Sequence, residues 1–118
     1  MKKIFLVEDD LLTARAFQKL LEISGFEVTH ALNGEEFLEK VHGGYDCVLL
    51  DIMLPVIDGW EVLKRVKERD DVRHIPVAFL TVLDDHKLRK KALSEGAAAF
   101  INKFQDDFLE KLNKILQK

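Results

Sequence analysis

Short apolar runs alternate with longer segments of helical periodicity along the whole chain. Residues 4–7, 47–50 and 76–80 are continuous apolar runs, which are typical of parallel strands buried on both faces. Residues 26–30 alternate apolar and polar side chains, as expected of a strand nearer the edge of a sheet, and residues 97–101 predict a short fifth strand. The chain therefore predicts five strands in order.

Apolar residues at helical spacing follow each predicted strand. The predicted helical faces are Thr13, Ala16, Phe17, Leu20 and Leu21; Phe37, Leu38 and Val41; Trp60, Val62, Leu63 and Val66; Leu88, Ala92 and Leu93; and Phe108, Leu109, Leu112, Ile115 and Leu116. Predicted helix starts lie at Asn33, at Asp84-Asp85 and at Asp106 or Asp107, and predicted stops at Gly25, Gly43-Gly44 and Gly96. Leu12 and Ile23 fall outside the first face and are expected to be exposed.

Alternation of strands and helices predicts an α/β fold: a doubly wound, five-stranded parallel sheet with helices on both faces and right-handed crossovers. The 118 residues contain no linker-like or repetitive segment, so residues 1–118 are expected to be one domain, with no output domain in this chain.

Composition narrows the classes of partner. The formal net charge of −3 predicts no direct nucleic-acid binding and no membrane association, and Arg89-Lys90-Lys91 is better explained as a solvated helix face than as a nucleic-acid patch. The single Cys47 cannot form an intrachain disulfide, and the chain begins with no signal-peptide pattern, so a reducing, cytoplasmic setting is expected. The four histidines lack ligand spacing and are expected at the surface or in loops.

Polar side chains stand at the ends of the predicted strands. Asp51 ends a buried strand, and taken alone it is equally well explained as a helix cap or as a reactive carboxylate. The carboxyl ends of parallel strands meet at one edge, which brings Asp51 near residues that follow other strands: Glu8 and Asp9, with Asp10 as a further candidate, then Thr81 and Lys103. Crowded carboxylates need a counter-charge, and their hard oxygen atoms suit Mg²⁺. A lysine and a hydroxyl beside them suit a phosphoryl group, which makes Asp51 a candidate nucleophile.

The chain resembles the receiver domain of two-component response regulators. The resemblance rests on VEDD at residues 7–10, LLDIMLPVIDG at 49–59, IPVAFLT at 75–81, EGA at 95–97 and FINK at 100–103. It implies a flavodoxin-like sheet of order 2-1-3-4-5.

The resemblance also implies roles for single residues. Glu8, Asp9, Asp51 and the backbone carbonyl of Met53 would hold Mg²⁺, and Asp51 would also accept a phosphoryl group from a histidine kinase or phosphotransfer protein. Thr81 and Lys103 would bind the phosphoryl group, and Phe100 would be the aromatic switch residue, which rotates inward and changes the face of helix four, strand five and helix five. A downstream effector protein or a missing output domain would read this face, and a phosphorylation-dependent homodimer is a further expectation.

Several positions depart from the family pattern. Phe104 replaces the usual proline after Lys103, and the following loop is about two residues shorter, so the direction of the Lys103 side chain is expected to differ from the family pattern. Val82 is expected to narrow access to the phosphoryl group, and Val56, where many relatives have glycine, is expected to alter its turn.

Two functions fit this pattern. The favoured one is a phosphorylation-controlled signalling switch, which is not expected to be an enzyme but a phosphoacceptor that catalyses its own phosphotransfer and slow dephosphorylation. The alternative is a receiver-like adaptor that binds a partner without phosphotransfer. A phosphohydrolase is disfavoured because Met53 stands where a second aspartate would be needed.

Overall fold

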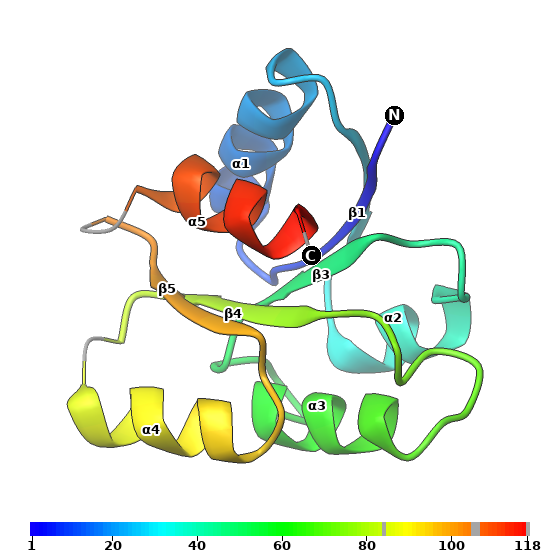
Figure 1. The fold of residues 1–118 in the computed structure, drawn as a ribbon, viewed down its shortest axis with the longest axis vertical. Helices are drawn as coiled ribbons and strands as arrows, with labels where there is room; N and C mark the ends of the chain where they lie inside the picture. Colours follow the sequence, from blue (N-terminus) through cyan, green and yellow to red (C-terminus); the bar gives the residue numbers. More distant parts are fainter. Residues whose placement is uncertain (84, 105–106, 118) are drawn as a thin grey trace.

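A computed structural model describes residues 1–83, 85–104 and 107–117. Five parallel strands form one sheet in the order β2-β1-β3-β4-β5, as predicted (Figure 1). The strands are β1 (Lys3–Val7), β2 (Glu27–Ala31), β3 (Cys47–Leu50), β4 (Val77–Thr81) and β5 (Ala99–Asn102). The helices are α1 (Leu11–Ile23), α2 (Gly34–Lys40), α3 (Gly59–Lys67), α4 (His86–Ser94) and α5 (Phe108–Leu116).

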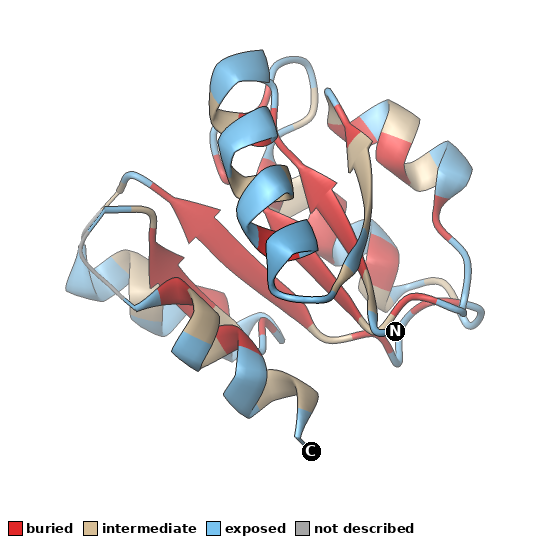
Figure 2. Cartoon of the chain, turned by 90° about the horizontal axis from the view of Figure 1, so that it is seen from above, coloured by how far each residue is buried: buried red, intermediate tan, exposed pale blue. Residues whose placement is uncertain are grey.

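The side-chain alternation of the strands divides the core into two layers. Phe5 and Val7 of β1 join Phe37 of α2 and residues of α3 and α4 on one face, while Ile4 and Leu6 join α1 and α5 on the other. Figure 1 shows α1 and α5 on one side of the sheet and the other three helices on the opposite side. The inner strands are buried and the exposed residues cover the outer sides of the helices (Figure 2). The inner strands β1, β3 and β4 therefore need apolar residues on both faces, which explains their continuous apolar runs in the sequence.

Several predicted helical faces differ from the structure. In α1, Ala14 is buried while Ala16 and Leu20 are exposed, so the buried face is turned from the predicted one. Leu12 and Ile23 are 80% and 75% exposed, as predicted. Apolar residues extend around more of α1 than the stripe that the sheet covers, so the periodicity alone does not identify its buried face.

The ends of α2 and the inner face of α4 were also predicted differently. Helix α2 ends at Lys40, and Val41 is a buried, extended C-cap residue rather than part of the helix that was expected to run to Gly43-Gly44. In α4, Leu93 is 52% exposed, so Ala92 is the buried residue and Leu88 is only partly covered. Asp85 and Asp107 cap α4 and α5, while Asp84 and Asp106 lie outside the described residues. Within those residues no helix has both the length and the apolarity needed to cross a membrane.

Candidate phosphoacceptor site

Asp51 lies at the carboxyl end of β3, between two other strands. The register pairs Val7 with Leu50, so the next residues of β1 and β3, Glu8 and Asp51, leave the sheet side by side. The backbone N–H of Asp51 donates to the carbonyl of Val7 at 3.2 Å, which extends the ladder by one bond and fixes the aspartate at its end. Its side chain is 10% exposed, enough to be reached from solvent.

The helix-cap explanation of Asp51 is wrong. Helix α3 begins eight positions later, and its N-cap is Asp58, whose carboxylate accepts from the N–H of Glu61 at 3.0 Å. Gly59 allows this start because a Cβ there would lie 2.4 Å from the carbonyl oxygen of Asp51. The carboxylate of Asp51 instead accepts the N–H of Met53 at 3.3 Å through Oδ1. Asp51 is thus held by its own loop and does not cap the following helix.

Glu8, Asp9 and Asp51 form one acidic cluster. Each offers a carboxylate oxygen, and the three oxygen atoms lie within 4.8 Å of one another. Glu8 is buried and Asp9 is exposed, so the cluster opens toward solvent on one side. Asp10, which the sequence placed provisionally at this edge, caps α1 by accepting the N–H of Thr13 at 3.3 Å. Carboxylates this close together repel one another, so the cluster needs a compensating positive charge beside it.

Lys103 supplies part of that compensation. Its Nζ donates to Oε1 of Glu8 and, at 3.2 Å, to Oδ2 of Asp51, and its side chain is 5% exposed. The lysine reaches both carboxylates although Phe104 follows it. The register explains this reach: β5 ends opposite Thr81, and the N–H of Lys103 donates to the carbonyl of Thr81 at 2.9 Å, which directs the chain along the same edge.

Burial and neighbouring charges shift the pKa values of Glu8 and Lys103. Burial raises the pKa of Glu8, and the ion pair with Lys103 and the N–H of Asp10 only partly oppose that rise. Burial acts to lower the pKa of the Lys103 ammonium, but the carboxylates of Glu8 and Asp51 outweigh it and raise that pKa. Lys103 is therefore positively charged at neutral pH.

The donor set fits Mg²⁺. The cluster brings three carboxyl groups together with one ammonium, so it has an excess of acidic groups that a divalent cation would compensate. The ligand atoms are carboxylate oxygens, which are the hard ligands that Mg²⁺ prefers, and the acidic cluster is open to solvent on one side. Met53 is adjacent through its N–H, and its carbonyl stays a predicted ligand.

Thr81 and Phe100 take different positions around the cluster. Thr81 is fully buried, and its hydroxyl accepts the N–H of Leu83 at 3.2 Å, which leaves the hydroxyl proton free to be donated. Phe100 is 2% exposed and packs in the same layer as Phe79, with ring centroids 6.5 Å apart. The ring is thus in the inward orientation.

Two residues near these groups were assigned other roles from the sequence. His30 was expected at the surface or in a loop, but it lies in β2, half-buried, where its Nε2–H donates to the carbonyl of Glu8 at 2.8 Å. Arg89 was assigned to a solvated helix face, but its Nη1 donates to the carbonyl of Phe100 at 2.7 Å. Neither contact has a signal in the local sequence, because each joins elements that only the fold brings together.

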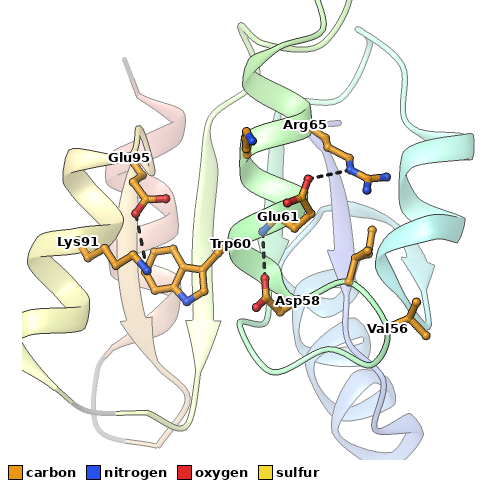
Figure 3. Close-up of a pocket in the computed structure, with 9 residues that line it drawn as sticks. Val56, Asp58, Trp60, Glu61, Arg65, Lys91 and Glu95 are labelled. Atoms are coloured by element: carbon orange, nitrogen blue, oxygen red, sulfur yellow. Dashed lines mark hydrogen bonds and ion pairs between the residues drawn. The ribbon is translucent and has the colours of Figure 1, made fainter.

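A separate hollow lies away from the acidic cluster. It has a volume of about 590 Å³ and lies between α3, α4 and the loop before α3, with Trp60, Glu61 and Lys91 among its lining residues (Figure 3). Val56, which also lines it, has φ of 67° and is 90% exposed. A β-branched residue in this left-handed region is strained, so the valine adopts a backbone shape that suits glycine.

Known proteins resemble this chain over nearly its whole length. Residues 4–116 match the model of the response regulator receiver domain. The transcriptional regulatory protein CrdR of Helicobacter pylori is 39% identical over 111 residues, which cover 92% of this chain and 52% of CrdR. The polar-differentiation response regulator DivK of Brucella anthropi is 36% identical over 107 residues, which cover 86% of this chain and 84% of DivK.

Solved structures show the same likeness. The non-phosphorylated HemR receiver domain of Leptospira biflexa has a TM-score of 0.90 at 26% identity, covering 100% of this chain and 96% of that one. The BeF3-activated DrrB receiver domain has a TM-score of 0.86 at 29% identity, covering 100% of this chain and 99% of that one. The chain thus spans about half the length of the curated transcriptional regulator CrdR and most of the length of DivK.

Proposed function

Because this chain belongs to the response regulator receiver domain family, whose members are signalling proteins that interact with histidine kinases and effector domains, we propose that Asp51 is its phosphoacceptor. The observation that carries the proposal is the contact of one ammonium, Lys103 Nζ, with the carboxylates of both Glu8 and Asp51. An exposed, unpartnered aspartate would need none of this arrangement.

The proposed reaction is transfer of a phosphoryl group from a phosphohistidine. An oxygen of the Asp51 carboxylate forms a bond to phosphorus as the bond between phosphorus and the histidine nitrogen breaks, and the imidazole leaves with the bonding electrons and takes up a proton. Glu8, Asp9, Asp51 and the Met53 carbonyl would hold Mg²⁺, which neutralises charge on the transferred group. Lys103 and the hydroxyl of Thr81 stabilise the phosphoryl oxygens as donors.

Phosphorylation would change the protein through Thr81 and Phe100. The hydroxyl of Thr81 can donate to a phosphoryl oxygen, and movement of Thr81 toward Asp51 changes the space beside Phe100. Phosphorylation would then increase the fraction of molecules in which the Phe100 ring points inward. The arrangement of α4, β5 and α5 that accompanies this orientation would become more populated as well. We propose that this face signals to an effector protein or an output domain in the cytoplasm, and that it is where phosphorylated copies would pair.

The test is intact mass after treatment with a small phosphodonor and Mg²⁺. The native chain is expected to gain one phosphoryl group, and Asp51→Asn, which removes the nucleophilic oxygen while keeping the size, is expected to gain none. Asp58→Asn is a matched control, because Asp58 caps α3 and should leave phosphorylation intact. Equal modification of the native chain and Asp51→Asn would refute the assignment. No modification of either would favour the adaptor that works without phosphotransfer.

A further inference from the structure

Helix α4 contacts the rest of the domain through a narrow apolar face. Ala92 is its only buried residue among those described in the helix, Leu88 is partly covered and Leu93 is 52% exposed. A single buried alanine contributes little apolar area, so other contacts must carry much of the attachment of α4.

Arg89 makes two contacts with the same residue of β5. Its Nη1 donates to the carbonyl of Phe100 at 2.7 Å, and its guanidinium carbon lies 5.0 Å from the centroid of the Phe100 ring. A planar guanidinium can cover a ring face and donate to a nearby carbonyl at once, which a lysine ammonium cannot do with the same geometry. Arg89 thus contacts both the backbone and the ring of the proposed switch residue.

A second cation of α4 contacts the other end of an aromatic row. Lys91 Nζ lies 4.3 Å from the centroid of the Trp60 ring, at the edge of the hollow between α3 and α4 (Figure 3). The Trp60 ring lies 5.0 Å from that of Phe79, which in turn lies 6.5 Å from Phe100. The row Trp60, Phe79, Phe100 therefore crosses from α3 to β5 beneath α4, with a cation of α4 at each end.

We propose that Arg89 is a positioning residue that holds the Phe100 ring inward, with Lys91 on Trp60 as the second attachment of α4. Rotation of the ring outward removes the face that Arg89 covers, so the ring orientation and the placement of α4 change together. The consequence for signalling rests on the proposed function, because it takes Phe100 as the switch. The contact itself does not depend on phosphorylation.

The positioning role can be measured without any phosphodonor. A chain carrying 4-fluorophenylalanine at position 100 reports exposure of that ring through the difference in its ¹⁹F shift between H₂O and D₂O. In Arg89→Met, which keeps the aliphatic stem, the population of the exposed ring is expected to rise about tenfold. Amide protection in α4 should fall by a similar factor while protection in β1 and β3 stays unchanged. Lys90→Met, an exposed position of the same helix, is the matched control.

Two further variants separate positioning from a general loss of structure. Arg89→Lys keeps the charge and should recover only part of the ring burial, because it cannot reproduce both contacts. Lys91→Met should increase acrylamide quenching of Trp60, the sole tryptophan, and loosen α4 without exposing the ring at position 100 as strongly. If Arg89→Met gave the same ¹⁹F exposure and α4 protection as Lys90→Met, the proposal would be overturned.

The phosphodonor reaction then distinguishes this proposal from the function on which it rests. If the inward ring favours phosphorylation, Arg89→Met should slow modification of Asp51 in proportion to the inward population that the ¹⁹F measurement shows to be lost. An exposed ring with an unchanged rate of modification would support Arg89 as the positioning residue and count against Phe100 as the switch.

Discussion

Replacing Lys103 by methionine tests whether its ammonium is the counter-charge of the acidic cluster. The substitution keeps most of the side-chain volume and removes the charge that contacts Glu8 and Asp51. The side chains of Lys103 and Glu8 are 5% and 4% exposed, so little water is available to take over the role of the ammonium. Loss of one partner from a buried ion pair costs about 3–5 kcal/mol, and we expect a loss of about 3 kcal/mol because the exposed Asp9 leaves one side of the cluster open to water.

The measurement is the free energy of unfolding in urea, with and without Mg²⁺. Without Mg²⁺ the variant should be destabilised by the full amount, and saturating Mg²⁺ should restore most of it because a divalent cation can replace the ammonium. Lys114→Met is a matched control, since the pair of Lys114 with Glu110 is exposed and should contribute little. Equal stability of Lys103→Met and the native chain without Mg²⁺ would refute the reasoning.

The free energy of unfolding of Lys103→Met should depend on pH in a definite direction. Without Lys103, burial still raises the pKa of Glu8, and the opposing effect of the ammonium is gone. A folded-state carboxyl with a raised pKa keeps a proton that the unfolded chain has released, so Lys103→Met should gain stability as the pH falls from 7 toward the ordinary value of 4.5. In the native chain the raised pKa of Lys103 gives a contribution that is complete below its ordinary value of 10.5 and is lost above the raised pKa.

Two further substitutions test the loop between Asp51 and α3. Gly59→Ala places a methyl group 2.4 Å from the carbonyl oxygen of Asp51, so we expect a loss of about 1–3 kcal/mol in urea unfolding together with slower phosphorylation. Unchanged values of both would show that the helix start can shift freely. Val56→Asn replaces a strained β-branched residue with one that tolerates positive φ, and it should stabilise the domain by about 1 kcal/mol in the same assay, whereas a loss would mean that the exposed valine makes a packing contact.

The sequence by itself determined the order of the helices and strands and the edge of the sheet at which Asp51 lies. Continuous apolar runs of four or five residues bounded by polar residues suit inner strands buried on both faces, and a parallel strand that ends on a carboxylate delivers it to the edge that all parallel strands share. These inferences need only local periodicity and the rules of parallel sheets. For the same reason the sequence could place Glu8, Thr81 and Lys103 at the edge of Asp51.

The tertiary structure decided which of these side chains touch. Local patterns treat Asp9 and Asp10 alike, but the register puts Asp9 in the acidic cluster and the first turn of α1 takes Asp10 as its cap. Arg89 looked like a solvated residue because its partner, Phe100, lies on another element. Lys103 reaches Glu8 across 95 positions of the chain. Such contacts depend on the spacing and register of packed elements, which the alternation of apolar and polar residues does not encode.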